Sequence, residues 1–165
     1  MELRRIYDEN FEYRGYLKDR AVPLEADEYV LVAGVILFSE GKFLATKRAE
    51  NKEYPHKWEF TVGSVVREES ALEGALRELS EEVGVKATGE ELLFLGTMKE
   101  TQKFSKIFLL EKNVEKIKLQ KSEVEDYKWI DKSELDAMLE ANEFAEPMAA
   151  RLRKYLPMIE DCFGA

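Results

Sequence analysis

The segment from Gly63 to Val85, GSVVREESALEGALRELSEEVGV, constrains the fold most, because it specifies both ends of a helix. Ser70 and Glu73 have the spacing of a capping box, which predicts that the helix begins at Ala71 with Ser70 as its N-cap. Gly84 is the residue type that most easily adopts the left-handed conformation with which many helices end. We therefore predict a helix between these two signals.

The predicted helix carries its apolar and its acidic residues on two adjacent faces. With successive residues roughly 100° apart around a helix, one face holds Leu72, Ala75, Leu76, Leu79 and Val83. The neighbouring face holds Glu78, Glu81 and Glu82. Glu78 and Glu82 are one turn apart with like charges, which destabilises a helix unless a positive group lies between them. Because Mg²⁺ and Mn²⁺ prefer carboxylate oxygens, this face is a candidate metal site, and a solvated surface helix is the alternative.

Short strands separated by turns account for most of the remaining chain. Apolar runs and alternating patterns predict strands at residues 3–7, about 11–17, 29–38, 42–48, 58–62, 92–98, 106–110 and 126–130. The first two form a predicted hairpin in an N-terminal extension, residues 1–28, and the next two form a central hairpin. Asp131 caps a predicted helix that ends at about Leu139, and a last helix spans roughly 143–158. We expect one domain, residues 1–165.

Composition limits the partners of this domain. The chain has 25 Lys and Arg against 34 Asp and Glu, a formal net charge of −9. An acidic surface repels nucleic-acid polymers and anionic membranes, so neither is an expected partner. The only cysteine is Cys162, which excludes an intramolecular disulfide and a cysteine-based zinc cluster. Because no apolar run is long enough to span a bilayer, we expect a cytoplasmic protein.

The fixed residues between Gly63 and Val85 resemble the box of the Nudix hydrolases. Gly63 is followed after five residues by Glu69, and after seven more by the run Arg77-Glu78-Leu79-Ser80-Glu81-Glu82-Val83-Gly84-Val85. This matches every fixed position of the pattern Gly-x5-Glu-x7-Arg-Glu-U-x-Glu-Glu-x-Gly-U, in which U is aliphatic. So many specified positions are far more specific than a lone glycine motif. The resemblance implies an α/β (α+β) fold, an αβα sandwich around a central mixed β-sheet.

The same resemblance implies a site for Mg²⁺, with Mn²⁺ as the alternative ion. The implied metal ligands are the carbonyl group of Gly63 and the side chains of Glu69, Glu78, Glu81 and Glu82. Arg77 would orient one of these glutamates. The hydrolysis that such a site supports needs a carboxylate to accept a proton from the attacking water.

In this superfamily the proton acceptor comes either from the box or from a later loop. Within the box, Glu81 and Glu82 are the candidates. The later candidates are Glu100, Glu123 and Glu125, and we favour Glu123 because its place before the strand 126–130 is similar to that of a catalytic glutamate in MutT-like members. Arg48 and Lys52 are candidate phosphate contacts, since they are expected near the box. His56 could also contact a phosphate, but a lone loop histidine is more often merely exposed.

The region around residues 6–66 also looks like the Nudix branch grouped with isopentenyl-diphosphate isomerase. True isomerases use a catalytic cysteine and several histidine ligands, whereas this chain has only Cys162 and His56. We therefore expect a Mg²⁺-dependent hydrolase that cleaves the diphosphate linkage of a nucleoside diphosphate-X compound or a similar small phosphorylated metabolite. The alternatives are an isomerase-like enzyme and a non-catalytic nucleotide-binding module. The N-terminal hairpin and the last helix are candidate homodimer contacts.

Overall fold

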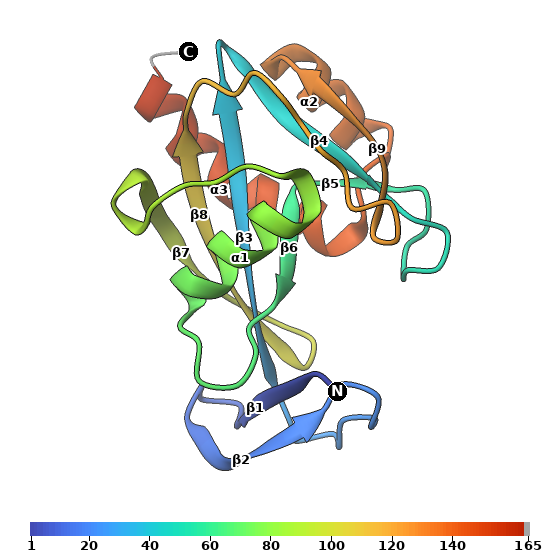
Figure 1. Ribbon diagram of the computed structural model, residues 1–165, viewed down its shortest axis with the longest axis vertical. Coiled ribbons are helices and arrows are strands. Elements are labelled where there is room, and N and C mark those ends of the chain that lie inside the picture. The colour runs from blue at the N-terminus through green and yellow to red at the C-terminus, as the bar shows by residue number, and fades with distance from the viewer. Residues whose placement is uncertain (164–165) are drawn as a thin grey trace.

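A mixed β-sheet lies between helices on both of its faces (Figure 1). The computed structural model describes the backbone of residues 1–163 and the side chains of residues 1–160, so the side chain of Cys162 lies outside the described residues. Its strands are β1 (Leu3–Tyr7), β2 (Tyr13–Asp19), β3 (Val30–Ser39), β4 (Lys42–Arg48), β5 (Trp58–Glu59), β6 (Thr61–Ser64), β7 (Leu92–Glu100), β8 (Lys103–Glu111) and β9 (Val124–Ile130). Its helices are α1 (Ala71–Val83), the 3-10 helix η1 (Gly89–Glu91), α2 (Lys132–Glu140) and α3 (Glu146–Phe163).

Strand β3 lies at the centre of the sheet because it is apolar on both sides and buried over almost its whole length. It pairs in parallel with β8, from Val30 opposite Lys103 to Phe38 opposite Glu111. It pairs antiparallel with β6, and the main sheet runs in the order β5-β4-β3-β8-β7, with β9 paired to β4. A parallel pair requires a long crossover between its strands, and α1 lies in that connection.

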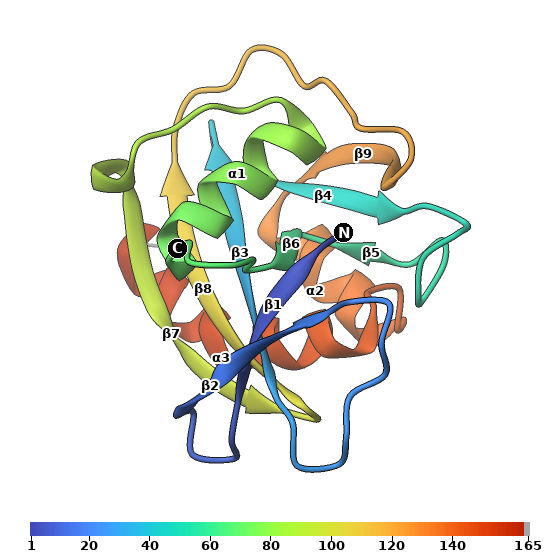
Figure 2. The same cartoon turned by 60° about the horizontal axis from the view of Figure 1, so that its bottom comes forward.

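The two faces of the sheet carry separate hydrophobic cores. Alternate residues of a strand point to the same face, so β3 places Leu31, Ala33, Val35 and Leu37 in the core that contains α1. Ile36 points to the opposite face, where α2 and α3 close the second core. Figure 2 shows α1 on one side of the sheet and α2 and α3 on the other. The predicted αβα sandwich with a mixed sheet is therefore confirmed.

Both predicted ends of helix α1 are confirmed. The Ser70 hydroxyl accepts a hydrogen bond from the Glu73 N–H at 3.1 Å, and the Glu73 carboxylate accepts one from the Ser70 N–H at 3.0 Å. Gly84 has a φ of 72°, and its N–H donates to the carbonyl of Ser80. Hydrogen bonds between nearby residues thus cap both ends of the helix, independently of its packing against the sheet.

Several predicted elements have other bounds in the structure, including the strands about 11–17, 106–110 and 126–130, which are Tyr13–Asp19, Lys103–Glu111 and Val124–Ile130. Two further elements show why bounds differ. The predicted strand 58–62 is divided at Phe60, because β5 pairs with β4 whereas β6 pairs with β3. The last helix begins at Glu146 rather than near residue 143. Phe144 instead forms a bridge with Trp58, and its ring is buried in the core between the sheet and α3. In both cases contacts with distant strands decide where the element begins.

Strands β1 and β2 form a separate antiparallel hairpin below the main sheet in Figure 1. Tyr7 bridges to Tyr29 at the entrance to β3, and the Leu3 carbonyl accepts a hydrogen bond of 2.8 Å from the Arg67 N–H. The hairpin therefore lies against the loop that precedes α1. Among the described residues, no helix has the length and apolar character needed to cross a membrane.

Candidate active site

The main chain of β6 passes directly beside the Glu78 carboxylate of α1. A Cβ atom added to Gly63 would overlap that carboxyl group. Any other residue at this position would push Glu78 away or move the strand. The requirement for glycine at the start of the box is thus steric in this structure, and it brings the Gly63 backbone and Glu78 together.

Arg77 gathers three carboxylates of the box around one guanidinium group. Its Nη1 donates to Glu78 Oε1 at 2.9 Å and to Glu81 Oε2 at 3.2 Å. Its Nε and Nη2 donate to the two oxygens of Glu69 at 3.1 and 2.7 Å, and Nη2 also reaches the Ser64 carbonyl at 2.9 Å. Hydrogen bonding to Glu69 is the main cause that raises the pKa of Arg77 above its usual value. Arg77 therefore remains charged and fixes the acidic side chains.

Glu69 is the most firmly held of the box glutamates. Besides its two contacts with Arg77, its Oε1 accepts the N–H of Val66 at 2.9 Å. It does not line the pocket described below. In this arrangement both oxygens of Glu69 contact Arg77, and its predicted role as a metal ligand stays a prediction.

Glu82 is buried, with 4 % of its surface exposed. Within the part of the chain whose side chains are described, its carboxylate forms no hydrogen bond or ion pair. Burial, followed by the negative charges of Glu59 and Glu78, raises its pKa well above the usual value. Burial also raises the pKa values of Glu59 and Glu78. Of these three carboxylates, Glu59 and Glu78 are ion-paired with Arg48 and Arg77, whereas Glu82 has no ion pair with a described side chain.

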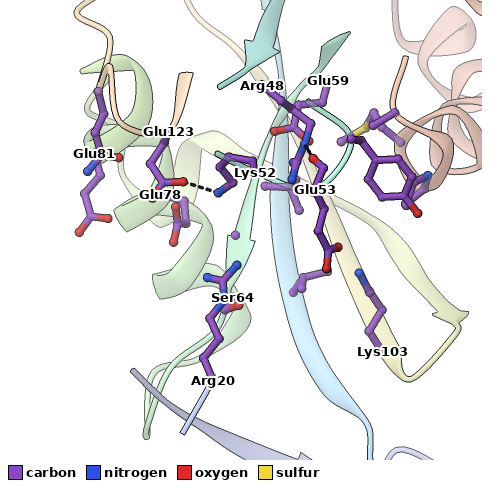
Figure 3. Close-up of a pocket in the computed structure, with 18 of the residues that line it drawn as sticks. Arg20, Arg48, Lys52, Glu53, Glu59, Ser64, Glu78, Glu81, Lys103 and Glu123 are labelled. Atoms are coloured by element: carbon purple, nitrogen blue, oxygen red, sulfur yellow. Dashed lines mark hydrogen bonds and ion pairs between the residues drawn. The ribbon is translucent and has the colours of Figure 1, made fainter. Parts of the chain in front are cut away.

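A pocket of about 440 Å³ opens beside these glutamates (Figure 3). Glu78 and Glu81 of α1 form its acidic side. Cations from the β4–β5 loop, from β8 and from α3 also line it, including Lys52, Lys103 and Arg151. Figure 3 shows Lys52 between Glu78 and Lys103. The pocket therefore presents carboxylates and cations to the same space, as an anionic ligand with a bound cation would require.

The predicted residues Arg48, Lys52 and Glu123 all line this pocket. Arg48 Nη1 donates to Glu59 Oε1 at 2.7 Å, and its Nε donates to the Glu53 carbonyl at 2.5 Å. Lys52 Nζ forms an ion pair with Glu123. Residues that are 71 positions apart in the chain are thereby joined at the pocket wall.

The other candidates from the sequence are engaged elsewhere. Glu100 accepts two hydrogen bonds of 2.8 Å from Arg151 and one of 2.5 Å from Ser105. Glu125 contacts His56 Nδ1 at 2.5 Å. None of Glu100, Glu125 and His56 lines the pocket. Their contacts favour structural roles, at the β7–α3 contact for Glu100 and between strand β9 and the β4–β5 loop for Glu125 and His56.

The sequence analysis does not predict three of the cations that line the pocket, namely Arg20, Lys103 and Arg151. Arg20 follows β2, Lys103 begins β8 and Arg151 lies on α3. Each has an ordinary charged pattern in its own segment, and only the fold brings the three segments to one pocket. No local signal in the sequence could have identified them.

The donor set fits a divalent cation in chemistry and charge. Gly63, Glu78, Glu81 and Glu82 offer oxygen atoms only, which Mg²⁺ and Mn²⁺ prefer, and Glu82 is a buried carboxylate without a hydrogen-bond partner among the described side chains. Within residues 1–160, however, no three His, Cys, Asp or Glu side chains already converge as a complete ligand shell. Arg77 occupies oxygens of Glu78 and Glu81 in this arrangement.

Comparison with known proteins identifies the family to which this fold and its glutamate-rich helix belong. Residues 28–152 match the family model of the NUDIX domain, and the chain belongs to that family. It is 32 % identical over 151 residues to an uncharacterized Nudix hydrolase of Listeria monocytogenes, lmo0368, covering 87 % of this chain and 88 % of the relative. The expectation of an enzyme of the Nudix hydrolase family is therefore confirmed.

Solved structures show the same fold. The crystal structure of DR0079 from Deinococcus radiodurans superposes with a TM-score of 0.78 at 21 % identity, covering 93 % of this chain and 98 % of that one. A bifunctional NMN adenylyltransferase/ADP ribose pyrophosphatase of Francisella tularensis, complexed with AMP and a Mn ion, gives a TM-score of 0.67 at 16 % identity. The match covers 84 % of this chain and 43 % of the bifunctional protein.

Proposed function

We propose that the protein is a divalent-metal-dependent hydrolase that cleaves the diphosphate linkage of a nucleoside diphosphate-X compound or a similar small phosphorylated metabolite. The observation that carries this proposal is the pocket in which Glu78 and Glu81 face Arg48 and Lys52 across one space. Carboxylates alone would repel a diphosphate, and cations alone would not assemble a metal site. The Francisella relative, which was crystallised with AMP and Mn, supports the same ligand chemistry.

In this proposal the box residues hold the cation and the loop residues hold the substrate. Gly63, Glu78, Glu81 and Glu82 would hold Mg²⁺ or Mn²⁺. When bound, the ion would neutralise diphosphate oxygens and lower the pKa of a water molecule. Arg48 and Lys52, which line the same pocket, would contact the anionic oxygens of the substrate. Arg77 keeps the box glutamates in place, as its hydrogen bonds to Glu69 and Glu78 indicate.

Glu123 is the proposed proton acceptor. It lines the pocket from the loop before β9, and its ion pair with Lys52 holds it at the wall. A carboxylate at this position can take the proton of a water that attacks a diphosphate bound beside Lys52. Glu81 and Glu82 stay as the alternatives within the box. Glu100 and Glu125 are less suited, because neither of them lines the pocket.

The test is a panel of diphosphate compounds incubated with the protein and Mg²⁺, with release of phosphate-containing products as the measurement. Wild-type protein should cleave some members, and chelation of the metal should stop the reaction. Glu82→Gln should lower kcat/KM by about two orders of magnitude or more, since a ligand is lost while the shape is kept. Glu140→Gln, a change of an exposed glutamate on α2, is the matched control.

Two results would contradict parts of the proposed function. Full activity in Glu82→Gln would show that the metal site is wrong. Tight binding of a panel member without turnover would indicate a non-catalytic nucleotide-binding module instead. The isomerase alternative has no support from the pocket, because its lining among the described side chains includes neither a cysteine nor a histidine.

A further inference from the structure

The pocket cations differ in whether the protein already neutralises them. The neutralised pairs join Arg20 to Glu2, Arg48 to Glu59, Lys52 to Glu123, Arg77 to the box glutamates and Arg151 to Glu100. The remaining pocket cation is Lys103. None of the described side chains forms a hydrogen bond or ion pair with its ammonium group. Lys103 is therefore the pocket cation that no described carboxylate neutralises by an ion pair.

Lys103 is also partly removed from water. It is the first residue of β8, and its side chain is half-buried on the pocket wall. Burial, followed by the nearby positive charge of Arg151, lowers its pKa. Glu100 is close enough to act on Lys103 electrostatically, but Arg151 and Ser105 occupy its carboxylate. Glu53 also acts on it from an exposed loop, without reaching ion-pair distance.

The location of Lys103 separates it from the candidate metal site. Figure 3 shows it across the pocket from Glu78 and Glu81, with Lys52 between them. Because Lys103 is partly removed from water and has no ion pair among the described side chains, a bound anion would form a strong charge-assisted hydrogen bond with its ammonium group. A ligand whose diphosphate lies near Glu78 and Lys52 would extend its remaining part toward Lys103. That part must then carry the anion that Lys103 lacks.

We propose that Lys103 binds a second anionic group of the substrate, either a phosphate monoester or a carboxylate, at a distance from the cleaved diphosphate. This inference rests on the proposed function and narrows it, because it assigns the substrate to diphosphate compounds whose group X carries an additional negative charge. An ammonium group is a compact point charge that accepts either anion without a fixed planar geometry. The source of the anion is therefore a question for experiment.

Two matched pairs of compounds test the inference. NADPH differs from NADH by one phosphate monoester, and UDP-glucuronate differs from UDP-glucose by one carboxylate, while the diphosphate is the same within each pair. We expect wild-type protein to prefer the anionic member of at least one pair by about tenfold in kcat/KM. This is the fold-change that corresponds to the free energy of one charge-assisted hydrogen bond. The pair that shows the preference identifies the anion. Lys103→Met should reduce this preference to near unity, whereas Lys103→Arg should retain most of it.

Three controls separate this role from general effects of charge or folding. Lys86→Met removes an exposed lysine outside the pocket and should leave the preference unchanged. Glu53→Gln should maintain or increase the preference, because it removes a negative charge near Lys103. A loss of preference in Glu53→Gln would instead indicate that Lys103 acts by holding the loop. Thermal unfolding verifies that Lys103→Met remains folded.

Calorimetric binding of the same compounds in the presence of Ca²⁺, a cation that also takes oxygen ligands, separates this inference from the proposed function. If no compound is cleaved but the anionic member binds more tightly and Lys103→Met removes the difference, the inference stands and the hydrolase proposal fails. If cleavage occurs without preference, or the preference survives in Lys103→Met, the inference is wrong and the hydrolase proposal stands. Failure of wild-type protein to bind any of the compounds would also overturn the inference.

Discussion

Arg77 is the residue on which the arrangement of the acidic site depends. One guanidinium group contacts Glu69, Glu78, Glu81 and the Ser64 carbonyl. Guanidinium donors are fixed in a plane, so they can hold several acceptors at defined angles, whereas an ammonium group cannot reproduce that geometry. The identity of this residue, as well as its charge, is therefore expected to matter.

We predict that Arg77→Lys lowers the free energy of unfolding of the metal-free protein by about 1–3 kcal/mol, because charged hydrogen bonds are lost while the glutamates stay close together. Activity should fall by about tenfold or more as Glu78 and Glu81 lose their positions. Urea unfolding and steady-state kinetics provide the measurements. Arg153→Lys, on the exposed side of α3, is the control. Equal effects of the two changes would argue against a special role for Arg77.

At the scale of elements, the sequence predicts α1 far better than it predicts the edges of the sheet. Ser70, Glu73 and Gly84 determine the helix ends through contacts within a few residues, so the pattern alone is sufficient. The segment around Phe60 alternates like one strand, yet it changes partner from β4 to β3. The choice of partner depends on residues far away in the chain, which no local pattern contains.

A buried carboxylate adds to the contacts that hold the N-terminal hairpin against the rest of the fold. Glu28 is 4 % exposed and accepts hydrogen bonds from Lys18 Nζ at 2.5 Å, Tyr16 Oη at 2.6 Å and the Glu25 N–H at 2.7 Å. The hydrogen bond from Lys18, followed by that from Tyr16, lowers the pKa of Glu28 from 4.5 to about 2. Both donors lie on β2, so ionised Glu28 holds that strand against the entrance to β3.

We predict that the hairpin loosens in acid. Because the pKa of Glu28 is lower in the folded state, its stabilising contribution is complete above pH 4.5 and is lost as the pH falls toward about 2. Glu28→Gln should show the same loosening at neutral pH, as faster hydrogen exchange of the β1 and β2 amides. Glu12→Gln, at an exposed position of the hairpin, is the control. Unchanged exchange in Glu28→Gln would contradict this role.

At the scale of the whole molecule, the acidic site opposes the stability of the metal-free protein. Burial raises the pKa values of Glu59, Glu78 and Glu82, so the folded state binds more protons than the unfolded state above the ordinary value of 4.5. The free energy of unfolding must then decrease as the pH rises through this range. A divalent cation that binds only the folded state would act in the opposite direction.

We predict that, in EDTA, thermal stability is lower at about pH 8 than at about pH 5, and that Mg²⁺ restores it by about 2.7 kcal/mol at a hundredfold excess over its Kd. Glu82→Gln should reduce both the pH dependence and the effect of Mg²⁺, because the titrating ligand is removed. Calorimetric scans at the two pH values, with and without Mg²⁺, provide the measurement. Identical Mg²⁺ effects in both proteins would mean that Glu82 does not contribute to metal binding.

The acidic half of the candidate site could be predicted from the sequence, whereas its basic half could be predicted only in part. Glu78, Glu81 and Glu82 lie on one helix, where the helical repeat alone places them together. Lys103 and Arg151 come from a strand and a helix that the fold brings to the pocket from a distance. Arg48 and Lys52 were predicted because they are close to the box along the chain as well as in space.

The position of the N-terminal hairpin has a practical consequence. The family model matches residues 28–152, whereas Glu2 and Arg20, which line the pocket, precede that region. The Leu3 carbonyl also binds the Arg67 N–H in the loop before α1. A version of the chain trimmed to the matched region would therefore lack two of the residues that line its pocket. Exchanging hairpins between relatives is, for the same reason, a route to altering which compounds the pocket admits without changing its glutamates.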